Sequence, residues 1–175
     1  MQPLPGRECG GCTACCVIPA IDSPELQKPP GVPCVHCELT QGCRIYAERP
    51  APCRTFECGW RVLPFIPDDL RPDLSGILTI PDDDAPSGYA DTSAIKFIVT
   101  GDETALTQIN FLECVAGLIY ARVPTYLATP LAPTHALAET LLNEKLAEAV
   151  ETRNAKAMTE ILLRVMAALK SAPRA

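Results

Sequence analysis

The stretch Cys9-Gly10-Gly11-Cys12-Thr13-Ala14-Cys15-Cys16 places four thiols within eight residues, and five more cysteines follow before residue 60. In a C-x2-C turn, two thiolates converge on one metal ion while backbone N–H groups point at the sulfurs. Gly10 and Gly11 suit such a turn because glycine accepts positive φ angles at little cost. The stretch therefore predicts a chelating site around which the N-terminal part of the chain is organised.

Cys15 and Cys16 are adjacent, and the side chains of neighbouring residues diverge in most backbone conformations. We therefore expect the two cysteines to serve different ions, or one of them to be a spare. A vicinal disulfide is the remaining alternative, which would be strained and is disfavoured where thiols stay reduced.

Composition and the N-terminal residues favour a metal site over a disulfide framework. The chain has 175 residues, 10 of them cysteine, and 47% hydrophobic residues, which argues for one folded domain rather than disorder. Residues 1–8 are polar and proline-rich, without the apolar segment of a secretory signal, and no apolar run reaches membrane-spanning length. We expect a cytoplasmic protein, in which clustered cysteines are metal ligands.

A second group of cysteines supplies the rest of the candidate site. Two tetrahedral zinc ions take eight ligands, whereas one [4Fe–4S] cluster takes four thiolates and shares the spacing C-x2-C-x2-C with a distant fourth cysteine. The pattern therefore predicts metal binding and leaves zinc and iron both open. His36 is a ligand, a residue that hydrogen-bonds a ligand, or a turn residue. The candidate metal ligands are Cys9, Cys12, Cys15, Cys16, Cys34, Cys37, Cys43, Cys53, Cys58 and His36.

The residues around these cysteines carry a family resemblance. The C-x2-C-x2-C-C run is followed by Pro33-Cys34-x-His36 and by Gly42-Cys43-x-Ile45-Tyr46-x-x-Arg49-Pro50-x-x-Cys53-Arg54-x-Phe56-x-Cys58. This pattern, over roughly residues 9–60, resembles the CxxCxxCC, or YkgJ-like, family of zinc- or iron-chelating cysteine-cluster proteins. The resemblance implies a chelator and no particular reaction. The ligands that it implies are Cys9, Cys12, Cys15, Cys16, Cys34, Cys43, Cys53 and Cys58, while Cys37 stands where many members carry an apolar residue.

The chain divides by composition at about residue 62. Residues 1–62 are rich in Cys, Pro and Gly and lack apolar periodicity, so packing alone cannot hold them and metal cross-links are the natural substitute. Residues 63–175 carry the periodic segments of a scaffold that forms one continuous domain with them. We predict an α+β fold in which a loop-rich, metal-stapled N-terminal region docks on a small sheet with a C-terminal helical hairpin.

The scaffold elements are predicted from periodicity and turn residues. Residues 75–80 and 94–100 are typical of strands, with a turn at 81–84, and residues 103–120 are typical of a buried helix. Residues 123–128 predict an edge strand, because Pro124 cannot donate to a sheet. From Thr134 onward, an apolar stripe predicts helix up to a break at Asn154. A second apolar stripe follows the break. The two stripes predict either two helices packed as a hairpin or one long bent helix.

Charge and the remaining side chains restrict the function. Residues 1–62 carry equal numbers of acidic and basic residues, so the net charge of −6 lies in 63–175, which argues against nucleic-acid binding. No membrane or protein partner is indicated. Arg44, Arg49 and Arg54 are expected to offset thiolate charge and to bind carbonyls rather than a substrate anion. Cys114 is expected to be a small core residue rather than a ligand.

Our first functional hypothesis is a protein that holds zinc, two ions by ligand count, through cysteine thiolates for a structural purpose. An all-cysteine site is closed and leaves no position for a reacting water. The alternative is an iron or iron–sulfur protein with a redox or modification role. A third hypothesis is metal storage or delivery, in which a spare thiol such as Cys37 exchanges a soft ion.

Overall fold

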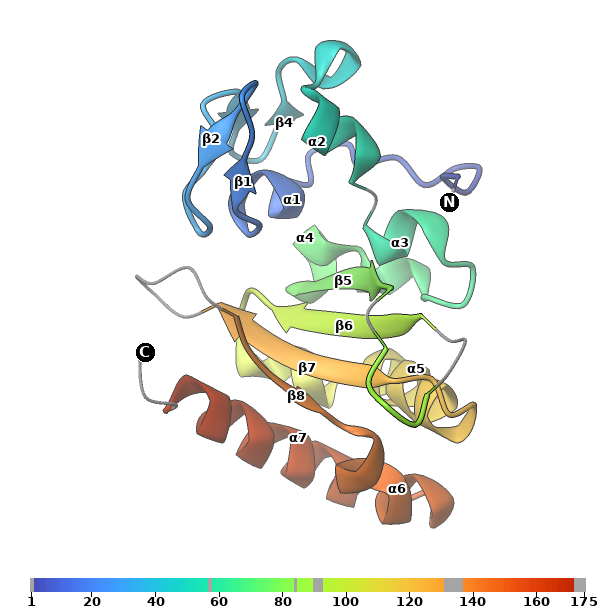
Figure 1. Ribbon diagram of the computed structural model, residues 1–175. Helices are drawn as coiled ribbons and strands as arrows, with labels where there is room; N and C mark the ends of the chain where they lie inside the picture. The colour runs from blue at the N-terminus through green and yellow to red at the C-terminus, as the bar shows by residue number, and fades with distance from the viewer. Residues whose placement is uncertain (1, 57, 84, 90–92, 131–136, 172–175) are drawn as a thin grey trace.

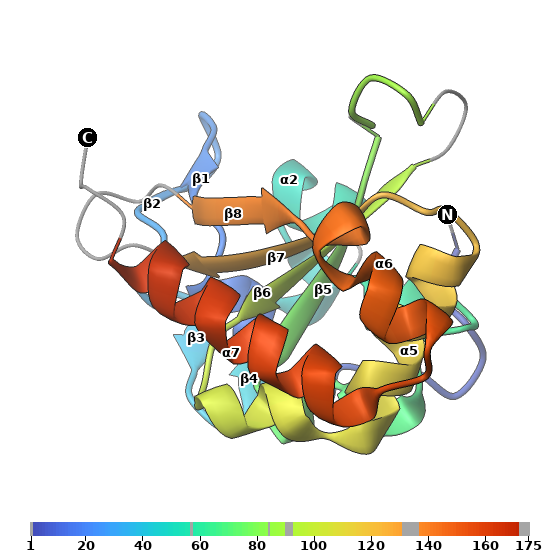
Figure 2. The same cartoon turned by 90° about the horizontal axis from the view of Figure 1, so that it is seen from below.

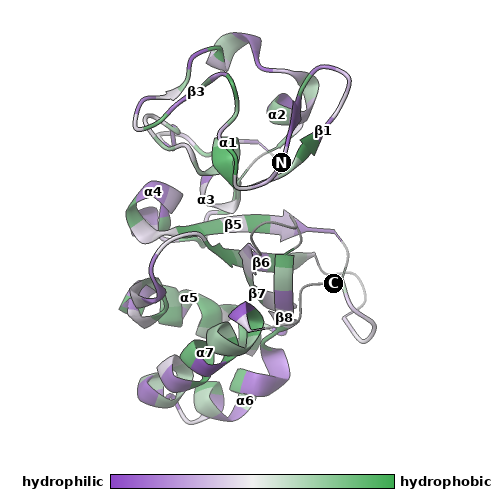
Figure 3. Ribbon diagram, turned by 90° about the vertical axis from the view of Figure 1, so that its left-hand side faces the viewer, coloured by the Kyte–Doolittle hydropathy of each residue, from purple (hydrophilic) through white to green (hydrophobic). Residues whose placement is uncertain are grey.

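Three layers make up the fold: the cysteine-rich region, a four-stranded sheet and a set of helices (Figure 1). The computed structural model describes residues 2–56, 58–83, 85–89, 93–130 and 137–171. The predicted α+β class is confirmed. Figure 3 shows the cysteine-rich region and the helices on opposite sides of the sheet.

The sheet contains one parallel pair between two antiparallel ones. Its strands are β5 (Ile77–Asp82), β6 (Ala94–Val99), β7 (Thr125–Pro130) and β8 (Leu137–Leu141), in the order β5-β6-β7-β8. β6 and β7 run parallel, whereas β5–β6 and β7–β8 are antiparallel. A parallel pair needs a long crossover, which is supplied here by the 3-10 turn η3 (Glu103–Thr107) and helix α5 (Ile109–Tyr120).

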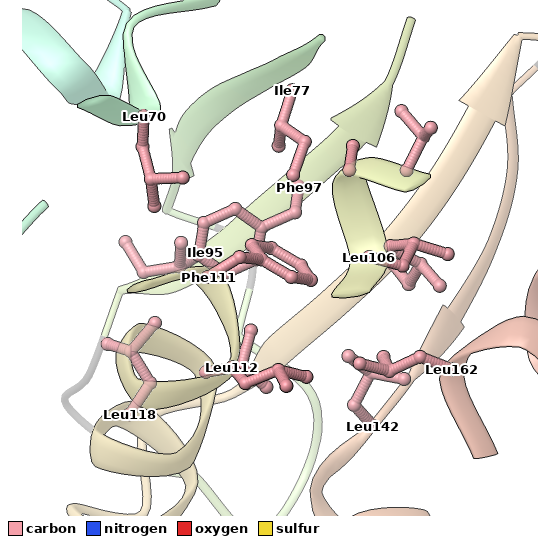
Figure 4. Packing of buried hydrophobic residues seen from close by; sticks show 14 of the residues in the cluster. Leu70, Ile77, Ile95, Phe97, Leu106, Phe111, Leu112, Leu118, Leu142 and Leu162 are labelled. Atoms are coloured by element: carbon pink, nitrogen blue, oxygen red, sulfur yellow. The ribbon is translucent and has the colours of Figure 1, made fainter. Parts of the chain in front are cut away.

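The main core lies between the sheet and the helices. With α5, helices α6 (Asn143–Glu151) and α7 (Ala155–Lys170) cover this face of the sheet (Figure 2). Alternate residues of a strand face opposite sides, so Ile95 and Phe97 of β6 point into this core (Figure 4). The rings of Phe97 and Phe111 pack edge to face with centroids 5.2 Å apart.

The opposite face of the sheet carries a smaller core. Leu78, Ile98 and Ala128, one from each of three neighbouring strands, are buried there. Ala14 and Ile18, in and just after the short helix α1, pack against them. The cysteine-rich region is therefore seated on the sheet by a contact that includes the helix carrying Cys15 and Cys16.

The cysteine-rich region consists of short elements with little core of their own. Among the described residues from 2 to 58, Leu26 and Cys34 are the buried hydrophobic side chains. This agrees with the expectation that packing alone cannot hold the region. The elements up to the sheet are α1 (Ala14–Val17), β1 (Ile21–Asp22), β2 (Gln27–Lys28), β3 (Cys37–Glu38), β4 (Gly42–Cys43), η1 (Tyr46–Glu48), α2 (Ala51–Thr55), α3 (Gly59–Val62), η2 (Asp68–Leu70) and α4 (Pro72–Ser75).

Two of the predicted scaffold elements are correct in kind and shifted at their ends. β5 begins at Ile77 and continues through Pro81 and Asp82, so the turn predicted at 81–84 starts too early. Lys96 explains the extension, because its ammonium pairs with Asp82 at 3.2 Å across the strand pair. The helix predicted over 103–120 is divided at Gln108, whose extended backbone separates η3 from α5.

Two predictions were wrong. β7 is an interior strand and not an edge strand; Pro124 lies just before it and uses only its carbonyl, which accepts the Ile95 N–H at 2.8 Å. The expected helix from Thr134 is also wrong, because residues 137–141 form β8, and helix begins only at Asn143. Thr134 itself lies outside the described residues.

The break at Asn154 is confirmed, and two helices follow β8 instead of one bent helix. The Asn154 side chain caps α7 by accepting the Ala157 N–H at 3.0 Å. Across the described residues, no helix is both long and apolar enough to span a membrane.

Candidate metal centre

Most of the N-terminal cysteines surround one cavity of about 230 Å³. They come from the first turn, α1, the loop before β3, β4, α2 and the residue before α3. Cys37 is not among the described residues that line this cavity. All ten cysteines are free thiols in the structure. The predicted ligands that line the cavity are Cys9, Cys12, Cys15, Cys16, Cys34, Cys43, Cys53, Cys58 and His36.

Close backbone packing brings the two halves of the cysteine pattern together. A Cβ at Gly11 would lie 2.5 Å from the carbonyl oxygen of Thr40. Gly42 has a φ of +100°, and a Cβ there would lie 2.6 Å from the carbonyl oxygen of Gly10. The first cysteine turn therefore fits against the β3–β4 turn only because the residues at the two close contacts, Gly11 and Gly42, have no side chain.

We expect Gly42→Ala to weaken metal binding roughly tenfold or more. The added methyl must displace the Gly10 carbonyl, and a forced backbone shift costs about 1–3 kcal/mol, where 1.4 kcal/mol is a factor of ten. Gly31→Ala is the matched control, since Gly31 also has a positive φ (+70°) but a methyl group there would meet no atom within 4 Å. Competition titration with a chromophoric zinc chelator measures both affinities. Equal losses in the two variants would contradict the packing argument.

Cys9, Cys12 and Cys58 form an inner group next to the scaffold. Burial raises the pKa of Cys58 to about 11, and the neighbouring thiolates of Cys9 and Cys12 add to the shift. Burial likewise raises the pKa of Cys12, with contributions from Asp73 and Cys9. The three thiols are thus close enough to interact electrostatically.

The other thiols form an outer group around the β3–β4 hairpin. Cys37 lies opposite Cys43 in the hairpin, and Cys34 donates its N–H to the Cys16 carbonyl at 2.9 Å. Burial raises the pKa of Cys37 to about 11, and Cys16 adds to this shift as do Cys34 and Cys43. Burial, with Cys34, Cys16 and Cys43 as neighbours, raises the pKa of Cys53. The outer group is therefore Cys16, Cys34, Cys37, Cys43 and Cys53.

Backbone N–H groups point at sulfurs in both groups, as expected for C-x2-C turns. His36 donates its N–H to the Cys34 sulfur at 3.4 Å. Backbone hydrogen bonds from Ala14 and Asp73 lower the pKa of Cys12 against its larger rise from burial. Arg61 does the same for Cys58. Such donors stabilise a thiolate, so these positions suit metal ligation.

Lys28 places a buried cation beside the outer group, a position that was not predicted from the sequence. Its ammonium donates to the carbonyls of Val17, Pro19 and Pro29 at 2.9, 2.5 and 3.0 Å. Burial lowers the pKa of Lys28, and the nearby thiolates, Cys34 foremost, oppose that shift. The sequence shows only a lysine in a segment without helical or strand periodicity. Nothing in that pattern indicates that the lysine is buried.

The arginines near the cysteines bind carbonyls, as expected. Arg44 donates to the Val35 carbonyl at 2.8 Å, and Arg54 donates to the Arg49 carbonyl at 2.5 Å. The Arg49 guanidinium donates to the Tyr46 carbonyl at 3.0 Å and lies 4.0 Å from the Tyr46 ring centre.

Tyr46 connects these arginines to the inner group. Its hydroxyl lies 3.9 Å from the Cys9 sulfur and accepts a hydrogen bond from Arg61 at 3.0 Å. Sequence reasoning included Tyr46 only as part of the family pattern. The structure gives it a position at the thiol cluster.

The thiols gather around shared space without forming a closed coordination site. Within the described ranges, no three His, Cys, Asp or Glu side chains are grouped as a formed metal site. The donors are nonetheless soft thiols supplied with N–H donors and neighbouring cations, and this chemistry fits zinc, iron or another soft ion.

Cys114 belongs to the helical layer and not to the cavity, as predicted. It lies on α5 and packs against the main core. Burial raises its pKa from the ordinary value of 9.0 to about 12.

We therefore expect Cys114 to resist alkylation in the native protein at pH 8. Its thiolate fraction is roughly a thousandfold below that of a thiol with the ordinary pKa, because each pKa unit is a factor of ten. The stability gained by burying the neutral thiol is complete below pH 9 and is lost as the pH rises toward 12. Mass spectrometry after iodoacetamide treatment, with and without denaturant, measures the labelling. Equal labelling in both conditions would contradict burial.

Comparison with known proteins gives one curated relative. UPF0153 protein PA1578.1 of Pseudomonas aeruginosa is 42% identical over 52 residues. The match covers 26% of this chain and 62% of the Pseudomonas protein, so this chain spans less than two thirds of that relative's length. The relative's name states no ligand and no reaction. No family model and no solved structure matches the chain.

Proposed function

We propose that this chain is a metal-chelating protein of the CxxCxxCC type that binds two zinc ions through cysteine thiolates. The observation that carries the proposal is the cavity lined by eight thiols, drawn from several short elements of a region with little core. The 42% identity to a UPF0153 protein supports the family assignment over part of the chain. A thiol-rich site of this kind belongs in a reducing compartment, so we propose a cytoplasmic protein.

The two thiol groups suggest how the ligands divide. We assign Cys9, Cys12, Cys15 and Cys58 to the inner ion and Cys16, Cys34, Cys43 and Cys53 to the outer one. Electrostatic contacts support the groups of Cys9, Cys12 and Cys58 and of Cys16, Cys34, Cys43 and Cys53. Cys15 lines the cavity and follows Cys12 at the same spacing by which Cys12 follows Cys9, and on that ground we place it in the first set. It also interacts with Cys16 and Lys28, so the two adjacent thiols do not diverge as expected and Cys15 lies between the two groups.

The proposed role of the ions is structural. Four thiolates close a tetrahedral site, so no position remains for a reacting water. Four thiolates around one Zn²⁺ leave each site with a net charge of −2, and Lys28 and Arg61 are placed to offset that charge. His36 would support the outer site through its N–H bond to Cys34.

Elemental analysis after anaerobic purification tests the proposal. About two zinc ions per chain are expected, together with a colourless protein. Negligible zinc would overturn it.

A second candidate, an iron–sulfur cluster, is favoured by the spacing of the thiols that line the cavity. Cys9, Cys12 and Cys15 follow C-x2-C-x2-C, and more distant cysteines line the same cavity, which is also the arrangement that holds such a cluster. This candidate predicts a brown protein with iron, acid-labile sulfide and visible charge-transfer absorption in the same preparation.

A further inference from the structure

We propose that Arg7 is the positioning residue of the inner centre, because it fixes the segment that carries Cys9 against helix α3, which directly follows Cys58. The inference rests on the proposed function, since it requires an ion bound between these two thiols. Arg7 precedes the family pattern of residues 9–60, so that pattern assigns it no role.

The guanidinium of Arg7 is held by backbone carbonyls. It donates to the carbonyl oxygens of Trp60, Leu63 and Ile66 at 2.5, 3.1 and 2.8 Å. All three acceptors belong to α3 or to the residues just after it. A planar guanidinium presents several N–H donors in a fixed arrangement, so one side chain can bind all three carbonyls together.

Two further contacts surround the Arg7 side chain, which is 13% exposed. Its guanidinium carbon lies 5.5 Å from the ring centre of the buried Trp60. It also pairs with Asp68 at 2.8 Å, but this carboxylate is 85% exposed, and an ion pair with so exposed a partner contributes little. The carbonyl contacts therefore do most to hold Arg7 in place.

The backbone around Arg7 is bound to the same helix. Leu4 donates its N–H to the Arg61 carbonyl at 2.8 Å, and the Arg61 side chain donates to the Arg7 carbonyl at 3.2 Å. Arg7 and Arg61 thus each bind the backbone of the segment that carries the other. The chain just before the first cysteine is therefore fastened to α3 at several points.

Both ends of this connection lie next to proposed ligands. Cys9 follows Arg7 by two residues, and Cys58 precedes Trp60 by two residues. Both cysteines line the cavity. The contacts of Arg7 therefore restrict how far apart the Cys9 and Cys58 thiols can move.

Helix α3 is a firm support because it is packed closely on the sheet. A Cβ at Gly59, the first residue of α3, would lie 2.6 Å from the methyl group of Thr79 on β5. Ligands that are held in place before the ion arrives lose less conformational entropy on binding. The contacts of Arg7 described above lie on α3 and the residues after it, whereas the outer thiols lie on other elements, so we expect the effect at the inner centre alone.

The zinc affinity of each centre in the full chain tests this role, measured by competition with a chromophoric chelator. On the proposed division, Cys53→Ser retains the inner ion and Cys58→Ser retains the outer one. Arg7→Gln added to Cys53→Ser is expected to weaken zinc binding at least about tenfold, which is about 1.4 kcal/mol. Added to Cys58→Ser, it should change the affinity by less than about threefold. Equal weakening in both backgrounds, or in neither, would overturn the inference.

Two more variants separate positioning from an effect of charge. Arg7→Lys keeps the charge but donates from a single nitrogen, so it is expected to weaken inner binding as well. Lys170→Gln is the control, since it removes one positive charge and an ion pair with Glu103 at 2.7 Å on the scaffold, and it should leave both affinities unchanged. Undiminished inner affinity in Arg7→Lys would assign the effect to charge and contradict the positioning role.

Failure of this inference is distinguishable from failure of the proposed function. Wild-type protein that binds two zinc ions, together with an Arg7→Gln variant of unchanged inner affinity, would refute the role of Arg7 alone. Wild-type protein without bound zinc would refute the proposed function, and the inference that rests on it would fall with it.

Discussion

Removal of the metal by a chelator is expected to unfold residues 2–58 and to leave the sheet and its helices folded. The cysteine-rich region buries two hydrophobic side chains among its described residues, Leu26 and Cys34, and full burial of such a side chain is worth about 1.5–3 kcal/mol. Structural zinc in small peptides binds with an apparent free energy of about 10–16 kcal/mol at pH 7. On the proposed function, metal binding therefore contributes more to the stability of this region than its hydrophobic burial does, so we expect metal loss to unfold this region alone.

Hydrogen–deuterium exchange read by mass spectrometry measures this result directly. Amides in 2–58 should lose protection after chelation, whereas those of β6 and α7 should keep it, since the main core lies between the sheet and the helices. Re-addition of zinc should restore protection. Loss of protection throughout the chain, or none at all, would contradict the division of stability between the two parts.

Cys58→Ser and Cys53→Ser are expected to lower the zinc content from two ions to one, each at a different centre. Cys58 belongs to the inner group and Cys53 to the outer group, and serine does not replace a thiolate as a zinc ligand at neutral pH. The double variant should bind none. Elemental analysis of the purified variants gives the stoichiometry.

Cobalt substitution checks that each single variant has lost one of two four-thiolate centres. Cobalt in a four-thiolate site absorbs by charge transfer from sulfur, so each single variant should retain about half of the wild-type intensity. Cys114→Ser serves as the control, because Cys114 is partly buried against the main core and does not line the cavity. Complete loss of metal in either single variant would show that the thiols form one shared centre and not two.

Several features of the cysteine-rich region could be predicted from the sequence because they depend on local chemistry. The glycine turn, the N–H···S contacts, the carbonyl-bound arginines and the core position of Cys114 all follow from spacing and residue type. These features depend on neighbours a few residues away or on the chemistry of single side chains. The division of the thiols into groups required the tertiary structure, because it depends on how the β3–β4 turn lies against the first cysteine turn.

The scaffold was less predictable because strand pairing is non-local. Leu137 and Leu141 are four residues apart, which fits a helical stripe, yet both lie in β8 and pair with β7. Pro124 argued for an edge strand, but it stands one residue before β7 and costs the sheet no hydrogen bond. In both cases the pattern was compatible with two structures, and the partner strand decided between them.

If the cysteine-rich region is held by metal as proposed, the contact of α1 with the sheet makes the solubility of this chain depend on its supply of metal. Leu78, Ile98 and Ala128 form a continuous hydrophobic strip across three strands, covered in part by Ala14 and Ile18. A cell short of metal would hold copies in which this cover is loose, and an uncovered strip on a sheet promotes association between copies. On the proposed function, the same contact that positions the cysteines would therefore make the chain prone to aggregate when metal is scarce.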